Sequence, residues 1–597
     1  MKKFIMFCIG IFTVLSAYSA QIVNVEYIHN AIQNKWDISL PYNSELSEPR
    51  VAANMKYLLT AVDVANQVVN GAAITDYGNG EYATMVAADT IATNAAVDEL
   101  ITQSGLTFRT TSDATSFSIT ISATGNFTIG WGDGVVETIE RTDTTATTYS
   151  HTYDTAKTRY VKLSGMATGY NVNGFVASVK IGTPTNIAGL SGSLGGVFPT
   201  LDSGEQPSFY GTFGGTTNLT SSIPADLFDG VKGAPREYMF ATLFDNSAIT
   251  GSIPSNLFSG IQGAPAKGMF ESTFRNASGL TGSIPEDLFA GISGKAQDYI
   301  FNMTFRGCSG LIGSIPENLF AGITGAPGVA FFFATFRNCS GLTGSIPENL
   351  FAGIDGAPQE SCFAETFAYC SKLTGKIPEN LFAGVKGAPA VQMFHSTFAG
   401  NRRMSAPIPE NLFAGIDGAP AGSMFAQTFA QSGICGALPE KLFAGVRGTP
   451  APAMFYQTFV DCGVSSIPAG LFAGIQGAPA SQMFYRTFHW NYDFNTIPAG
   501  LFAGIEGAPA SQMFQGTFDT CPNVTSIGAP LFGNISGAAA SNMFYGTFSG
   551  DSGLTGASAQ LADGSYLYEN WEFTSDQNTY NGATKLDDYE SMPAYWK

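Results

Sequence analysis

One pattern of apolar and polar residues recurs along the C-terminal two-thirds of the chain. An Ile-Pro or Leu-Pro dipeptide returns in register, with proline at positions 224, 254, 285, 316, 347, 378, 409, 439, 468 and 498, so that successive positions differ by 29, 30 or 31. A variant, Ile527-Gly528, continues the series, and a degenerate copy lies around Leu194. Self-similarity at a period of this length is typical of stacked repeat architectures. We therefore expect an α/β solenoid of about 11 units over residues 185–555.

Each unit begins with a segment that has strand character. Residues 280–284 read Leu-Thr-Gly-Ser-Ile and alternate apolar with small residues, which predicts a short strand. The proline that follows ends the strand and can open a helical turn. Ser283 and Glu286 have the spacing of a capping box, although Ser283 could equally be the last exposed residue of the strand.

The second half of the unit carries paired rings. A Gly-Ala-Pro link, as at residues 263–265, can reverse the chain and start a second helix. Met269-Phe270 and Phe274 then place two rings at i and i+4, on one face of a helix. A unit is thus predicted to be a strand and two short helical segments. One unit of this size cannot bury its own apolar face, so the units must stack.

Cysteines keep the phase of the repeat. Cys308, Cys339 and Cys370 take the same position in three successive units. Cys462 and Cys521 share that position, which other copies fill with Ala277, Asn401, Ser432 and Asn491. A position that accepts these four residue types is expected to be a small, buried ladder site at the strand entrance.

Two further cysteines depart from this phase. Cys362 takes the Met position of the Met-Phe pair, and Cys435 is out of phase. Disulfides remain the alternative to the ladder if the protein is exported. No Cys-x-x-Cys pair or nearby histidine set predicts a metal site.

The flanking regions differ from the array. Residues 21–104 have helical spacing, for example from Val51 to Val69, and predict a helical region broken at 76–80. Residues 105–181 alternate as short strands and predict a small β-sandwich. Residues 556–597 are rich in aromatics and are expected to cap the last repeat, with a carbohydrate-stacking site as the alternative.

Composition and charge narrow the class of protein. Hydrophobic residues make up 44% of the 597 residues and charged residues only 13%, and glycine is abundant at 69. This favours a regular, turn-rich architecture over disorder. The net charge of −19 and the absence of a basic stripe argue against nucleic-acid binding.

The N-terminus predicts export. Residues 1–20 combine Lys2-Lys3, a short apolar run and small residues at a cleavage site, as in a secretory signal peptide. Beyond it we see no apolar segment long enough to span a bilayer, so no transmembrane segment is expected after the signal is removed. The expected location is secreted or at the cell surface, without an anchor that the sequence reveals.

The string from Thr335 to Pro347, Thr-Phe-x-x-Cys-Ser-x-Leu-Thr-Gly-x-Ile-Pro, resembles the BspA-like (Treponema-type) leucine-rich repeats of bacterial surface proteins. The resemblance implies a leucine-rich-repeat horseshoe and a role in adhesion or host contact. The units of this chain are longer than the family's usual repeat, which leaves the helical side and the curvature open.

A second resemblance concerns the sandwich. Trp131-Gly-Asp-Gly134 followed by His151-Thr-Tyr153 resembles the polycystic-kidney-disease (PKD) type of immunoglobulin-like domain. Such domains serve as extracellular spacers or binding modules. In some relatives the residue at Asp133 could assist a calcium site, but here we expect an aspartate that stabilises the turn.

The chain shows no constellation for catalysis. It contains no Gly-x-Ser-x-Gly elbow, Walker-type loop or His-Glu-x-x-His motif, and its four histidines, at 29, 151, 395 and 489, are scattered. Glutamates in one phase of the repeat are interpreted as favouring the starts of helices; they lie at 286, 317, 348, 379, 410 and 440. We expect no enzyme and no cofactor.

These observations favour a bacterial repeat protein that mediates adhesion or binds a host or matrix protein or a glycan. A structural envelope or spacer protein that self-associates through residues 21–104 is the alternative, and a glycan-active enzyme is a remote one. The ligand-binding residues stay unknown. If specificity lies within the array, it is expected where the copies vary, as at Lys232, Gln262, Asp355, Lys386, Asp417, Arg447 and Glu506.

Overall fold

The computed structural model describes residues 74–76, 82–84 and 105–597. The predicted signal peptide and the helices expected in 21–104 lie outside the described residues. Within that stretch, β1 (Ile74–Asp76) and β2 (Tyr82–Thr84) pair as antiparallel strands. The chain divides into two compact units, residues 1–208 with 216–233 and residues 209–215 with 234–597.

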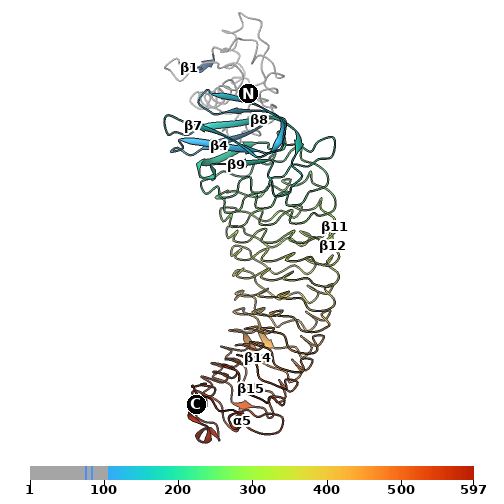
Figure 1. Cartoon of the computed structure of the whole chain (residues 1–597), viewed down its shortest axis with the longest axis vertical. Helices are drawn as coiled ribbons and strands as arrows, with labels where there is room; N and C mark the ends of the chain where they lie inside the picture. Colours follow the sequence, from blue (N-terminus) through green and yellow to red (C-terminus); the bar gives the residue numbers. More distant parts are fainter. Residues whose placement is uncertain (1–73, 77–81, 85–104) are drawn as a thin grey trace, which may run out of the picture. The chain divides into compact units, whose positions relative to one another are not determined.

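The first unit contains an antiparallel β-sandwich, as predicted for residues 105–181. One sheet has the order β10-β3-β8-β5-β6 and the other β7-β4-β9 (Figure 1). The strands are β3 (Gly105–Thr110), β4 (Ser116–Ile121), β5 (Ala123–Gly130), β6 (Val136–Arg141), β7 (Thr147–Thr152), β8 (Tyr160–Tyr170), β9 (Val179–Ile181) and β10 (Ile187–Gly192). A short 3-10 helix, η2 (Pro184–Asn186), leads into β10.

The core of the sandwich comes from alternating apolar positions. Phe127 and Ile129 of β5 are buried, while Asn126 between two buried positions is exposed. Phe108 and Phe117, from opposite sheets, pack with ring centroids 5.5 Å apart. The sheets extend to residue 192 because β10 pairs with β3, beyond the predicted boundary at 181.

The second unit is a stack of coils, one per sequence repeat (Figure 1). Its strands are very short and pair in parallel between neighbouring coils. They are β11 (Gly294–Lys295), β12 (Ile323–Thr324), β13 (Cys435–Ala437), β14 (Gly463–Ser466), β15 (Thr496–Ile497) and β16 (Ser526–Ile527). The strand predicted at 280–284 is reduced to one bridge between Leu280 and Gly251.

The prediction of two helical segments per repeat is wrong. The segment with the paired rings forms a run of consecutive β-turns, which we call the turn run. In it the amide of Ala241 donates to the carbonyl of Tyr238, three residues back, while the amide of Phe240 donates to Met269 in the next coil. Because alternate amides bond to the neighbouring coil, they are not available to an α-helix.

The backbone conformation of the turn run repeats every four residues. In one coil Ser361, Glu365 and Tyr369 have φ of 55°, 56° and 59°. Positive φ at the third position of alternate turns is the requirement of type II turns. Phe363 and Phe367, four residues apart, therefore reach the same buried side without a helix.

Stacked phenylalanines form the core of the second unit. Phe274, Phe305, Phe336 and Phe367, on successive coils, have neighbouring ring centroids 5.7, 5.7 and 5.9 Å apart and planes within 8° of parallel. A second file runs through Phe270 and Phe301, and Phe289 packs between the files, 4.5 Å from Phe270. This periodic burial confirms that the region is a repeat array.

The aromatic C-terminal segment packs on the last coil. Tyr580 stacks on Phe548 at 5.3 Å, and Trp571 and Trp596 lie 5.6 and 6.3 Å from Phe544. The segment holds the only α-helix among the described residues, α5 (Leu567–Asn570), and two 3-10 helices, η3 (Tyr589–Ser591) and η4 (Ala594–Trp596). Both tryptophans are buried, so their rings serve packing and not a carbohydrate site.

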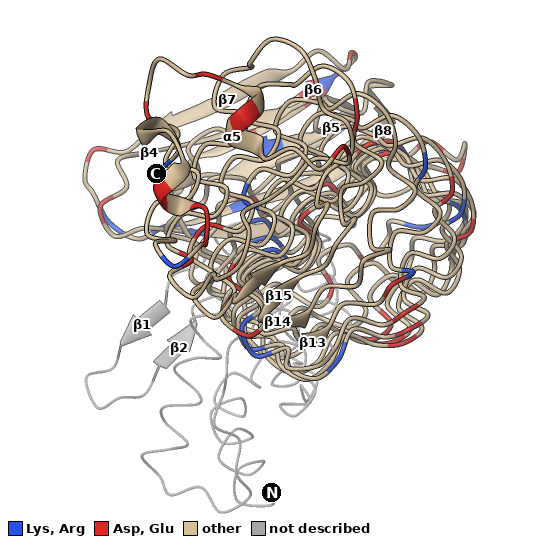
Figure 2. Cartoon of the chain, turned by 90° about the horizontal axis from the view of Figure 1, so that it is seen from below, with Lys and Arg blue, Asp and Glu red and all other residues tan. Residues whose placement is uncertain are grey.

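Charges are thinly spread over the second unit. In the view of Figure 2, Lys, Arg, Asp and Glu together colour only a minor part of the described chain. Within the described part of the chain, no helix has the length and apolar character needed to cross a membrane.

Candidate functional site

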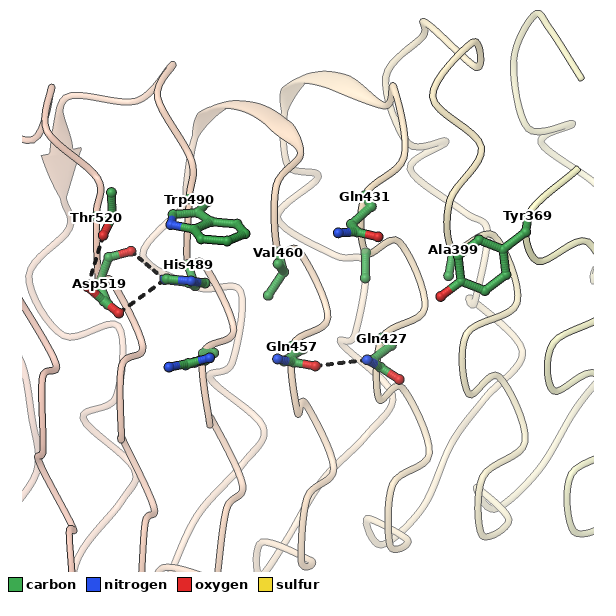
Figure 3. A pocket seen from close by; sticks show the side chains of 12 residues that line it. Tyr369, Ala399, Gln427, Gln431, Gln457, Val460, His489, Trp490, Asp519 and Thr520 are labelled. Carbon is green, nitrogen blue, oxygen red and sulfur yellow. Dashed lines mark hydrogen bonds and ion pairs between the residues drawn. The ribbon is translucent and has the colours of Figure 1, made fainter. Parts of the chain in front are cut away.

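A hollow on the turn run is the candidate site of the second unit. Four small buried residues stand in one phase on successive coils, Ala368, Ala399, Ala430 and Val460. The neighbouring coils carry longer side chains in this phase, including Arg306, Arg337 and His489. The cavity measures about 430 Å³, and we call it the turn-face groove (Figure 3). It is lined by Tyr369, Ala399, Gln427, Ala430, Gln431, Gln457, Val460, Arg486, His489, Trp490, Asp519 and Thr520.

Polar side chains form the two walls of the groove. Gln427 and Gln457 lie on one side of the floor, and Gln431 and Trp490 on the other (Figure 3). The amide Nε2 of Gln427 donates to Oε1 of Gln457 at 2.8 Å. This bond uses one N–H of Gln427, whose Oε1 also accepts from the Ser396 hydroxyl at 3.3 Å. The second N–H of Gln427 and both N–H groups of Gln457 are not used by it.

An aromatic ring stands at each end of the groove. Tyr369 is 42% exposed and Trp490 is 44% exposed. They belong to coils four steps apart, so about 19 Å separates them at a rise of about 4.8 Å per hydrogen-bonded coil. The groove therefore offers two flat, partly wet ring faces to an elongated ligand.

Ionic contacts hold the end of the groove near Tyr369. Arg337 pairs with Glu365 through its Nη1 and the carboxylate Oε2. The same guanidinium lies over the Tyr369 ring, 5.6 Å from its centroid. The ion pair holds Arg337, and Arg337 in turn contacts the Tyr369 ring.

At the other end, His489 positions Trp490. Nδ1 of His489 lies 2.8 Å from the backbone oxygen of Asp519 and 3.3 Å from its carboxylate Oδ2. Since both partners are acceptors, Nδ1 carries a hydrogen and donates. Burial lowers the pKa of His489, although the Asp519 carboxylate opposes this shift. The imidazole stacks on Trp490 with centroids 4.5 Å apart.

Arg486 is the cation of the groove that has no anionic partner. Its Nε is buried without a hydrogen-bond partner, and its guanidinium lies 5.5 Å from the Tyr485 ring centroid. Among residues 105–597, no carboxylate lies within ion-pair distance of it. A buried N–H without an acceptor is uncommon in folded proteins, and Nε of Arg337 is in the same state.

Two of the variable positions expected to carry specificity lie elsewhere. Asp355 and Lys386 are exposed and form an ion pair at 3.5 Å, outside the groove lining. His489, one of the four histidines scattered along the sequence, lines the groove. His395 is half-buried, and burial lowers its pKa. The signal that could have revealed the groove is the run of small residues at 368, 399, 430 and 460.

The cysteine ladder is confirmed. Cys308, Cys339 and Cys370 are buried, and each thiol donates to a phenylalanine carbonyl of the preceding coil at 2.9 Å. Asn401 in the same position donates through Nδ2 to Phe367 at 2.9 Å. All seven cysteines of the described residues are free, so the disulfide alternative does not hold there, and only Cys435 among them is exposed.

The interpretation of the glutamate series is wrong, because no helix follows these residues. All six are exposed, and Glu286, Glu317 and Glu379 accept hydrogen bonds from asparagines one coil on. Nδ2 of Asn318 donates to Glu286 at 2.9 Å, and Nδ2 of Asn349 donates to Glu317 at 2.7 Å. Their role is to link neighbouring coils on the surface.

Asp133 stabilises the turn of the sandwich in which it lies. Its Oδ1 accepts from the amide of Val135 at 3.1 Å, and its Oδ2 lies 2.6 Å from Nε2 of His151. Partial burial opposes ionisation, but the hydrogen bonds from His151 and Val135 bring the pKa of Asp133 below its ordinary value. The described part of the chain contains no group of three metal-ligating side chains.

Comparison with known proteins gives no relative. No protein-family model, curated protein or solved structure matches this chain.

Proposed function

We propose that the protein is a secreted or cell-surface binding protein whose repeat array holds an elongated ligand in the turn-face groove. The observation that carries the proposal is the interruption of a regular array by this groove. Three successive coils place the short side chains of Ala399, Ala430 and Val460 on its floor, and the residues around that floor are mainly aromatic, amide-bearing or charged. Packing alone needs no such local variation in a repeat protein.

The family resemblance supports a location at the bacterial surface. Files of buried Leu, Ile and Phe and a Cys/Asn ladder that bonds to backbone carbonyls agree with a relative of leucine-rich repeats. The turn run in place of helices is the difference. In the sandwich, Trp131, His151 and Tyr153 pack together, with Tyr153 Oη donating to the carbonyl of Trp131 at 2.8 Å. This cluster supports the PKD-like spacer.

The lining of the groove favours binding over glycan hydrolysis. Hydrolysis of glycosidic bonds ordinarily needs two carboxyl groups that flank the bond. Asp519 is the single carboxylate of the lining, and it faces His489. Adhesion to a host or matrix glycan or protein is therefore the function we propose, without a catalytic step.

Filling the groove tests this function. Ala430→Arg places a long side chain on the floor in a phase that already holds Arg275, Arg306 and Arg337, so the fold should tolerate it. We expect the full chain to bind an array of glycans and matrix proteins saturably, and Ala430→Arg to lose about tenfold or more in affinity. Asp417→Arg, an exposed change outside the lining, is the matched control.

Two results would count against the proposal. One is the absence of saturable binding to any arrayed glycan or protein. The other is equal affinity of wild type and Ala430→Arg, with unchanged melting temperatures.

A further inference from the structure

The backbone under the groove has no free strand edge. The amide of Gln427 donates to Tyr456 in the next coil, and the amide of Ala430 donates to Gln427 within the turn run. Gln431 and Val460 continue this alternation. An extended peptide would need unpaired amides and carbonyls to add as a strand. The groove must therefore recognise its ligand through side chains.

Those side chains suit the surface of a sugar. Gln427, Gln431 and Gln457 offer planar amides, each with donors and an acceptor, at the spacing of the coils. Tyr369 and Trp490 offer flat rings at the ends, and such rings pack on the apolar face of a pyranose while their polar atoms stay wet. The floor is formed by the small side chains of Ala399, Ala430 and Val460.

Arg486 favours a ligand that carries a negative charge. The next coil carries Gly516 beside it, where a Cβ would lie 2.9 Å from Cγ of Arg486. A side chain at 516 would displace the arginine, so the glycine allows its present position. The guanidinium has no carboxylate partner, whereas Arg402 is paired with Asp461 at 2.7 Å and Arg337 with Glu365.

We propose that the turn-face groove binds an acidic oligosaccharide, with Arg486 holding a carboxylate or sulfate group of one sugar and Trp490 stacking on a neighbouring ring. This inference rests on the proposed binding function and specifies its ligand class. A guanidinium binds planar oxyanions through two parallel hydrogen bonds, which suits a uronate carboxylate. A distance of about 19 Å between the end rings fits a chain of a few sugars and not a monosaccharide.

The test uses defined oligosaccharides and the full chain. Titration calorimetry would compare hyaluronan and galacturonan hexasaccharides, their methyl esters, a chondroitin sulfate hexasaccharide and cellohexaose. We expect one or more of the acidic probes to bind. The methyl ester of a uronate probe that binds should have an affinity at least about tenfold lower, since esterification removes the negative charge that Arg486 contacts. The uronate and sulfate arms distinguish the two oxyanions.

Variants locate the contact. Arg486→Gln should lower affinity for the acidic probe about tenfold or more and abolish the preference over the ester. Trp490→Ala should weaken acidic and neutral probes alike. Arg447→Gln removes an exposed arginine outside the lining and should change neither.

The outcomes distinguish the acidic-sugar inference from the proposed binding function of the groove. If cellohexaose binds as tightly as every acidic probe, or if Arg486→Gln leaves the preference intact, the acidic-sugar inference is wrong while the groove function stands. If Ala430→Arg leaves all sugar binding unchanged, or if none of the probes binds while a protein from the array does, a sugar site in the groove is excluded.

Discussion

At the scale of single residues, the stack depends on how inward carbonyls are satisfied. The carbonyl of Phe270 accepts the amide of Thr273 in its own coil and the hydroxyl of Thr304 from the next coil, at 2.9 Å. The carbonyl of Phe274 accepts the Cys308 thiol in the same way. A buried carbonyl without such partners would destabilise the fold. Where it is Cys or Asn, the small residue after the ring pair thus serves as a hydrogen-bond donor.

Asp551 is the exception in this ladder. It occupies the Cys/Asn position of the last coil and is buried; its Oδ1 accepts the amide of Cys521 at 2.6 Å, and its Oδ2 has no partner. Burial raises the pKa of Asp551 well above its ordinary value. The folded state therefore favours the protonated acid. Its contribution to stability is complete below about pH 4 and is lost as the pH rises through the folded-state pKa.

Asp551→Asn should stabilise the protein as the pH rises. An amide can still accept from Cys521 and can donate to the Phe518 carbonyl, as Asn491 donates to Phe459 at 2.7 Å. Relative to wild type, we expect a gain of about 1–3 kcal/mol at neutral pH and little gain near pH 4. Urea unfolding between pH 4 and 8 measures the difference.

The control for this prediction is Asp417→Asn, which removes an exposed carboxylate and should not change the pH dependence. A constant difference between Asp551→Asn and wild type across this range would contradict the assignment of a raised pKa.

The cysteines should divide sharply by reactivity. Burial raises the pKa of Cys362, Cys370 and Cys462 to about 12, and thiols react as thiolates. In the native protein we expect a thiol reagent at pH 8 to label Cys435 rapidly and the other six described cysteines only after denaturation. Cys435→Ser should abolish the rapid phase. Rapid labelling of more than one of these thiols would show that the ladder is open.

At the scale of the element, a four-residue spacing of rings is compatible with two structures. An α-helix places i and i+4 on one face, and so does a turn run that repeats every four residues. The local sequence does not distinguish the α-helix from the turn run, since the same Met-Phe-x-x-x-Phe string fits both. The choice follows from the amides, because alternate ones bond to the adjacent coil.

Glycine at a positive-φ position of the turn run should be stabilising. Ser423 has φ of 52°, and Gly268 holds the same place in an earlier coil. Relief of left-handed strain predicts that Ser423→Gly gains up to about 1 kcal/mol, and that Ser423→Val loses at least as much. The midpoint of urea unfolding reports both changes.

Ala414→Gly is the matched control. Ala414 is exposed and is not among the described residues with positive φ, so glycine there should cost about 0.5–1 kcal/mol. A loss of stability in both glycine variants would contradict the turn-run conformation.

At the scale of the whole molecule, an array of coils needs its open end closed. The last ring files end on Tyr580, Trp571 and Trp596. Without this cover, Phe544 and Phe548 would face water on one side. Because each coil contacts only its neighbours, a substitution at this end should destabilise only the coils close to it.

Trp596→Ala tests the cap. Removing this buried ring should cost about 3–5 kcal/mol and speed hydrogen exchange at the amides of Gly546 and Phe548, which bond to the C-terminal segment. Amides near Phe336 should keep their protection. Tyr492→Ala, the loss of a ring that is 48% exposed, is the control. Uniform loss of protection along all coils would show that the array unfolds as one unit.

The sequence predicted some features of fold and site and missed others, for identifiable reasons. Alternation around Phe117 and Ile119 predicted the sandwich, because a half-buried strand has a period of two. The end of the sheet was missed, since β10 is added through a pairing with β3, which lies far earlier in the chain. The groove was missed because Gln427, Gln457 and Arg486 are neighbours only across coils, one repeat apart in the chain.

The sequence by itself determined the repeat, its period and the small buried position shared by Cys308 and Asn401, since identical units impose identical burial at each step. Only the tertiary structure decided that the ring pairs lie on turns, because the hydrogen-bond partners of alternate amides belong to the next coil. Tertiary structure also decided where the array departs from its regularity. Ala399 and Ala430 are unremarkable in one repeat and form a groove floor only when several coils are stacked side by side.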